Sequence, residues 1–125
     1  MKKITTSLCI VLCTTVAYAD LTVNVYSELS QGSETEQAIV QNYVGGVGKG
    51  YLWANLTLHK NKQAELFCYD GDYSIEDFNS IAAESVNTII NHPKYDKTTD
   101  ETPVEMLLLY KLQEMHPCTQ KSKKK

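Results

Sequence analysis

Apolar residues recur at three- and four-residue steps along most of the chain, which is the spacing of one face of an α-helix. The first such stretch follows Ser33 and Glu36, which have the spacing of a capping box at a helix start. Its apolar positions are Val40, Tyr43, Val44, Val47, Tyr51, Ala54 and Leu58. The pattern predicts a helix that begins after Ser33 and buries one face.

A second helix is predicted to begin at Ser74, with Asp77 three residues later as a weaker capping box. Its apolar stripe consists of Phe78, Ala82, Val86 and Ile90, flanked by Ile75, Ile81 and Ile89. We expect it to end near His92 and Pro93, because the residue before a proline disfavours helical backbone.

The start of a third helix is marked by Thr102 as N-cap, Pro103 at the first helical position and Glu105 at the third. Its inner face would carry Val104, Leu108, Leu112 and Met115, and it would end at His116-Pro117-Cys118. Residues 106–110 are all apolar and cover most of the circumference of this helix. Either the helix is covered on two sides, or Met106 and Leu109 form a homodimer contact.

Residues 20–30 fit two structures. The alternation of Leu21, Val23 and Val25 suits a short strand, whereas residues 26–30 suit a fourth short helix.

Four glycines in the first helix cost roughly 4 kcal/mol of helix propensity relative to alanine. They are Gly45, Gly46, Gly48 and Gly50. A phosphate-binding loop does not fit, since Tyr43 stands at the leading glycine and Gly50 stands where Ser or Thr should bind magnesium. Gly46, Gly50 and Ala54 instead predict, together with Tyr43, a smooth packing surface for another helix. A local helix break is the alternative.

The first nineteen residues have the organisation of a secretory signal peptide. Lys2 and Lys3 precede an apolar stretch too short to span a bilayer, and Ala17-Tyr18-Ala19 forms a small-x-small cleavage site before Asp20. We therefore expect cleavage after Ala19, a periplasmic protein without a stable membrane anchor, and a helical domain over residues 20–120. Residues 121–125 form a lysine-rich tail that we expect to be disordered.

The chain carries twelve lysines, no arginine and a formal net charge of −3. Residues 20–120 are more acidic, with six lysines against fifteen acidic residues and a net charge of −9. Nucleic-acid binding is not expected, because arginine is the residue that most favours bidentate contacts with phosphates and bases.

Removal of the signal peptide leaves Cys68 and Cys118 as one pair in an oxidising compartment, which predicts a disulfide. A bridge over fifty residues stabilises a fold by about 4 kcal/mol in the chain-entropy model. The fold class predicted is all-α: a small bundle of about four helices stapled by one disulfide.

Catalytic motifs are missing from the sequence. It shows no Cys-x-x-Cys spacing and no Ser-His-Asp arrangement with a nucleophile context, and His59, His92 and His116 are scattered. No pair of histidines has the helical spacing of a zinc site. We expect no enzymatic activity, no cofactor and no metal ion.

Five short motifs resemble, in order and approximate spacing, those of the Rap family, the resistance-associated immunity proteins of type VI secretion systems. They are Tyr43-Val44-Gly45-Gly46-Val47, Trp53-Ala54-Asn55, Phe67-Cys68, His92-Pro93, and residues 108–112 leading into His116-Pro117-Cys118. The chain departs from the family pattern at Asn42, Asp70 and His116. The resemblance implies a small periplasmic helical antidote that neutralises a peptidoglycan-cleaving amidase effector.

The expected function is therefore binding and steric blockade of an amidase, and the alternative is a small periplasmic chaperone or stress-response protein. The expected contact residues are Tyr69, Asp70, Asp72 and Tyr73, since tyrosines anchor interfaces and carboxylates steer toward a basic cleft. An ordinary acidic turn before Ser74 would have the same composition. Residues 94–102 and the Met106/Leu109 face are further candidates for the contact.

Overall fold

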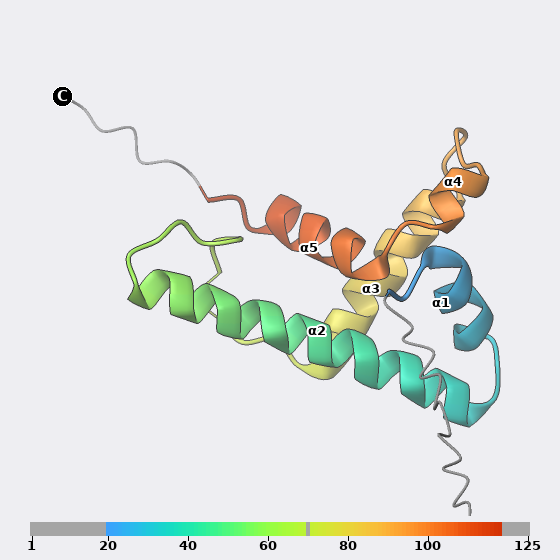
Figure 1. Cartoon of the computed structure of the whole chain (residues 1–125), viewed down its shortest axis with the longest axis horizontal. Coiled ribbons are helices and arrows are strands. Elements are labelled where there is room, and N and C mark those ends of the chain that lie inside the picture. Colours follow the sequence, from blue (N-terminus) through green and yellow to red (C-terminus); the bar gives the residue numbers. More distant parts are fainter. Residues whose placement is uncertain (1–19, 70, 119–125) are drawn as a thin grey trace, which may run out of the picture.

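Five helices form the part of the chain that the computed structural model describes, residues 20–69 and 71–118 (Figure 1). They are α1 (Val23–Ser30), α2 (Glu34–Lys60), α3 (Ile75–Ile90), α4 (Lys97–Asp100) and α5 (Val104–Met115). Cys68 and Cys118 form a disulfide, so the prediction of a small all-α bundle with one disulfide is confirmed. The predicted signal peptide, Asp70 and the lysine-rich tail lie outside the described residues.

The longest helix, α2, runs along one side of the molecule, and α3 and α5 pack against it and against each other (Figure 1). The short helices α1 and α4 lie together at the end where α2 begins. The largest fully buried side chains are Phe67, Phe78, Leu108, Leu112, Val23, Val44 and Val104. They come from four helices and from the segment after α2, and belong to one core cluster. Within the described ranges, no helix has both the length and the apolar character needed to cross a membrane.

Both predicted capping boxes are present. Ser33 Oγ accepts a hydrogen bond from the Glu36 amide at 3.4 Å, and the Glu36 carboxylate accepts one from the Ser33 amide at 2.7 Å. At the start of α3, the Asp77 amide donates to Ser74 Oγ at 3.1 Å and the Ser74 amide donates to Asp77 Oδ2 at 2.8 Å. Each box satisfies amide groups that a helix start otherwise leaves without partners.

The predicted start of the last helix is wrong by one residue. Pro103 is the N-cap rather than the first helical residue, and no side chain caps the helix. The cause is a pairing of extended chain: the Val23 amide donates to the Thr102 carbonyl at 3.0 Å, and the Val104 amide donates to the Leu21 carbonyl at 2.8 Å. This pairing holds Pro103 in extended backbone, so the helix begins at Val104.

The same pairing shows which of the two structures predicted for residues 20–30 is present, the short strand or the short helix. Extended backbone is limited to an isolated bridge between Thr22 and Pro103, and the helix α1 begins directly after it at Val23. The short-helix alternative is therefore correct. The helix begins at Val23, three residues before the expected start at Tyr26. Val23 and Tyr26 are its buried residues.

The predicted helix-packing surface of Tyr43, Gly46, Gly50 and Ala54 is wrong. Gly46 and Gly50 are exposed, and a Cβ built on either of them would meet nothing within 4 Å other than its chain neighbours and the backbone of its own helix. The glycines that meet another helix are Gly45 and Gly48, where an added Cβ would lie 2.6 Å from Ile75 Cγ2 and 2.2 Å from Phe78 Cγ. At about 100° per residue, the inward glycines lie about 100° to 160° around the helix from Gly46 and Gly50, so the predicted glycine face is close to the opposite side. The helix continues without a break through all four glycines.

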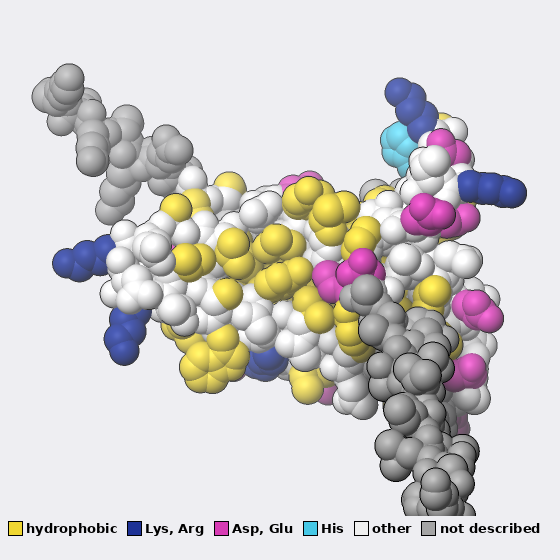
Figure 2. All heavy atoms as spheres, viewed as in Figure 1, with side chains coloured by type: hydrophobic (Ala, Val, Ile, Leu, Met, Phe, Trp, Pro, Cys, Tyr) yellow, Lys and Arg dark blue, Asp and Glu magenta, His cyan; other side chains and the backbone are white. Residues whose placement is uncertain are grey.

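The apolar run in α5 is covered on two sides, by α3 and by α2. Leu107 and Leu108 are buried and Leu109 is half-buried against the core, whereas Met106 and Tyr110 are exposed. Figure 2 shows hydrophobic side chains gathered over the face that α2 and α5 share. A homodimer contact through Met106 and Leu109 stays a prediction.

Alanine substitution of a packed glycine and of an exposed glycine in α2 should have opposite effects on the free energy of unfolding. Gly48→Ala should destabilise the protein by about 1–3 kcal/mol, because the new methyl group overlaps a fully buried phenyl ring. Gly50→Ala is the matched control and should stabilise it by up to about 1 kcal/mol, through helix propensity alone. Urea unfolding measures both. Similar effects at the two positions would contradict the packing described.

The capping boxes are expected to make the fold sensitive to acid. The Ser74 amide and hydroxyl groups lower the pKa of Asp77, so its stabilising contribution is present above the ordinary aspartate pKa and is lost as the pH falls through the lower folded value. Asp77→Asn should therefore flatten the dependence of unfolding free energy on pH between about 5 and 2. Glu76→Gln, which removes a carboxylate from the same turn but leaves the box intact, is the control.

Candidate functional site

A groove of about 950 Å³ lies between the exposed side of α2 and the segment that follows this helix. From α2 it is lined by Lys49, Leu52, Trp53, Asn55, Leu56 and His59, and from the segment by Glu65, Cys68, Tyr69, Gly71 and Asp72. Trp53 is 69% exposed and Leu56 is 59% exposed. Two large apolar side chains therefore face solvent in a concave part of the surface.

The end of α2 turns the chain back to form the second wall of the groove. Lys62 adopts a left-handed backbone with φ of 57°, and the Gln63 amide donates to the Leu58 carbonyl at 2.9 Å. This arrangement closes a helix end in the manner of a Schellman motif. The next residues then return along α2.

Asn55 fixes the returning segment to α2. Its side chain is 5% exposed; Oδ1 accepts from the Leu66 amide at 2.8 Å, and Nδ2 donates to the Phe67 carbonyl at 2.6 Å. One amide side chain thereby satisfies two backbone groups that no regular structure pairs. Phe67 itself is 1% exposed and belongs to the core, so the segment is held by burial as well as by hydrogen bonds.

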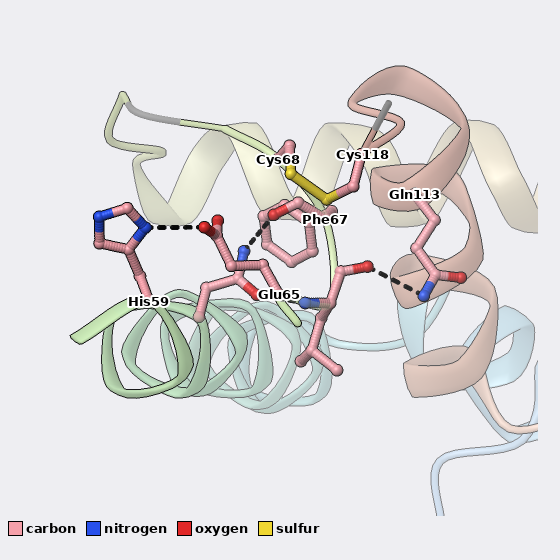
Figure 3. The surroundings of a disulfide bond; sticks show 8 residues. His59, Glu65, Phe67, Cys68, Gln113 and Cys118 are labelled. Carbon is pink, nitrogen blue, oxygen red and sulfur yellow. Dashed lines mark hydrogen bonds and ion pairs between the residues drawn. A yellow bond between two sulfur atoms is a disulfide. The ribbon is translucent and has the colours of Figure 1, made fainter. Parts of the chain in front are cut away.

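The other side of the segment is fixed to the end of α5 (Figure 3). Gln113 Nε2 donates to the Leu66 carbonyl at 3.0 Å, and the Cys68 amide donates to the His116 carbonyl at 2.8 Å. The Cys68–Cys118 disulfide, with Cα atoms 4.9 Å apart, adds a covalent link at the same place. The three residues 66–68 thus bind the groove wall to α2 and to the end of α5.

An aromatic cluster continues the wall toward α3. The ring of Tyr69 stacks on Tyr73 with centroids 4.6 Å apart and lies 4.4 Å from the ring of His116. Tyr73 Oη lies 2.5 Å from His116 Nε2, and its ring is 5.3 Å from Phe78. Burial raises the pKa of Tyr73, with smaller contributions from Tyr69 and Asp77. Both tyrosines are thus packed within the fold, and only Tyr69 lines the groove.

Two polar contacts join the α2 side of the groove to the segment, and all four of their residues line it. Lys49 Nζ lies 2.9 Å from Asp72 Oδ1 and donates to the Tyr73 carbonyl at 2.5 Å. His59 Nδ1 lies 2.8 Å from Glu65 Oε1, which is also visible in Figure 3. The Asp72 side chain is 82% exposed, so this carboxylate is still open to a partner.

The predicted contact residues do not form one surface. Tyr69 and Asp72 line the groove, Tyr73 lies in the aromatic cluster behind it, and Asp70 lies outside the described residues. Met106 and Leu109 are on α5 and do not line the groove. A role for any of them in contacting a partner stays a prediction.

Sequence reasoning missed the two residues that make the groove apolar, Trp53 and Leu56. Trp53 was considered only as part of the motif Trp53-Ala54-Asn55, and neither residue belonged to the predicted apolar face of the helix. A tryptophan outside the apolar stripe of an amphipathic helix was the signal available, because a large exposed aromatic side chain is unusual unless it meets a partner.

The titratable side chains of the described residues do not gather into a metal site. No cluster of three or more His, Cys, Asp or Glu side chains suited to a metal ion occurs in residues 20–69 and 71–118. His59 is engaged by Glu65 and His116 by Tyr73, and His92 Nδ1 accepts a hydrogen bond from the Lys94 amide at 3.1 Å. What the groove offers is a rigid, partly apolar surface for binding.

Comparison with known protein families, curated proteins and solved structures found no match for this chain.

Loss of the Asn55 clamp is expected to cost stability at the groove wall. Asn55→Ala should destabilise the protein by about 2–4 kcal/mol, because two backbone groups of the segment lose their partners at a buried site. Asn42→Ala, an exposed position on the same helix, should change stability by less than about 0.5 kcal/mol. Chemical denaturation measures both, and a mild effect at Asn55 would show that the segment is held without it.

Proposed function

We propose that this protein is a periplasmic immunity protein, which binds a peptidoglycan amidase effector through the groove beside α2 and blocks its active site sterically. The observation that carries the proposal is the exposure of Trp53 and Leu56 in a groove whose second wall is fixed by Asn55 and the disulfide. Exposed tryptophan is a typical centre of a binding hot spot. A rigid wall lowers the entropy lost on binding.

Charge and chain organisation support the same proposal. The excess of nine acidic charges over residues 20–120 would speed encounter with a basic partner. The signal-like residues 1–19 and the disulfide agree with a protein that works in an oxidising compartment. The resemblance of the short motifs to the Rap family supplies the class of partner, a cell-wall amidase.

The exposed apolar face favours a second candidate, a small periplasmic chaperone. Besides the groove residues, Ile39, Met106, Tyr110 and Met115 are exposed on α2 and α5. A broad apolar surface suits a protein that holds unfolded clients. The two candidates differ in where binding energy should be located: at the groove for an antidote, and across the whole face for a chaperone.

The proposal is tested by adding the chain of residues 20–125 to a panel of purified type VI amidase effectors and measuring peptidoglycan hydrolysis. Inhibition of one effector at a one-to-one ratio is expected. Trp53→Ala should weaken that binding by about 30-fold or more, the loss typical of a hot-spot residue of about 2 kcal/mol. The stability of the variant should change little, because most of its side chain is in water.

Tyr110→Ala is the matched control, since Tyr110 is 56% exposed on α5 and lies outside the groove. It should leave inhibition unchanged. If no effector is inhibited and the protein instead suppresses aggregation of a reduced, unfolded client, with Trp53→Ala and Tyr110→Ala weakening this activity alike, the chaperone reading replaces the proposal.

A further inference from the structure

The carboxylate of Glu105 lies where α5 begins, between the chain that enters α1 and the side of α2. Its Oε1 accepts hydrogen bonds from the Leu21 amide at 3.2 Å and from the Tyr43 hydroxyl. Its Oε2 is buried and makes no hydrogen bond to any part of the chain that the structure describes. A buried carboxylate oxygen without a partner is costly, so its surroundings call for a donor.

The groups around this carboxylate bring it no positive charge. Tyr43 and Tyr51 face it from α2, the Tyr51 hydroxyl donates to the Glu105 backbone carbonyl at 3.0 Å, and Asp20 lies close enough to act on Tyr43. Burial, the hydrogen bond to Glu105 and the nearby negative charges raise the pKa of Tyr43 to about 12. The salt bridges within residues 20–69 and 71–118 do not include Glu105.

Cleavage after Ala19 would create a cation at this place. The predicted cut converts the Asp20 amide into a terminal ammonium group with three donors. Consecutive backbone nitrogens are less than about 4 Å apart, and the Leu21 nitrogen is already bonded to Oε1. Rotation about the Asp20 backbone can therefore bring the new ammonium group to Oε2.

We propose that Glu105 is a binding site for the α-ammonium group of Asp20, so that removal of the signal peptide creates an ion pair that joins the mature N-terminus to α5. Before cleavage the same nitrogen is a neutral amide, and the pair does not exist. Maturation thereby stabilises the folded domain at the junction of α1, α2 and α5. The inference depends on the cleavage site and is independent of the groove.

Displacement of the ammonium group by one residue tests the pair. Two chains are compared, one beginning at Asp20 and one at Ala19, each with Glu105 or with Glu105→Gln. At pH 7 the folding equilibrium constant of the chain that begins at Asp20 should be about tenfold larger, and this ratio should fall below about twofold with Glu105→Gln. Glu28→Gln, which removes an exposed carboxylate from α1, should keep the tenfold ratio. Equal stability of the two starts would overturn the proposal, and so would a ratio that survives Glu105→Gln.

The titration of the terminal amine tests the pair in the unmutated chain, where folding is not at issue. By nitrogen-15 NMR the α-amino pKa of Asp20 should lie about one unit above the ordinary range of about 7.7–8.0. A raised pKa means that the stabilisation is complete below the ordinary value and is lost as the pH rises through the folded one. A value within or below the ordinary range would contradict the ion pair.

Discussion

The close approach of α2 and α3 determines the arrangement of the other elements. Gly45 and Gly48 leave no side chain between the helices, so the Phe78 ring lies directly against the α2 backbone. Leu52 and Asn55 follow Gly48 at helical spacing on the same face of α2, nearer its C-terminal end. There this face is covered by the returning segment instead of by a helix, with Phe67 in the core and Asn55 bonded to its backbone. One face of α2 thus holds α3 at its centre and the groove wall near its end.

The groove follows from how that segment is stabilised. It has no regular hydrogen-bonding pattern of its own, so its backbone groups depend on side chains of α2 and α5 and on the end of α5. The segment contacts α2 through Asn55 and leaves Trp53 and Leu56 exposed in the groove beside it. A wall fixed in this way has little freedom left to lose when a partner binds, which is the physical reason to place recognition here.

Features that depend on neighbouring residues were predictable from the sequence. The two capping boxes, the stripe of α3 and the pairing of Cys68 with Cys118 are of this kind, because each is set by spacing along the chain or by the number of cysteines left outside the predicted signal peptide. The start of α5 could not be predicted in this way, because Pro103 is held in extended backbone by residues some eighty positions earlier. The glycines that face α3 could not be predicted either. The helical period fits a glycine face at Gly45 and Gly48 as well as one at Gly46 and Gly50, and only the position of Phe78 selects between them. Tyr69 and Asp72, which the sequence suggested as contact residues, line the groove, but no groove was predicted, because its apolar side comes from α2 and depends on the chain reversal after Lys60.

The disulfide also changes what a break in the backbone can do. Cys68 and Cys118 enclose α3, α4 and α5 in one closed loop of chain, and the exposed turn between α3 and α4 contains His92, Pro93 and Lys94. A protease that cuts this turn opens the loop, but both pieces remain one covalent molecule, and the segment at Cys68 stays joined to the end of α5. Two cuts within the loop are needed before any piece of the loop loses its covalent link to the rest of the molecule.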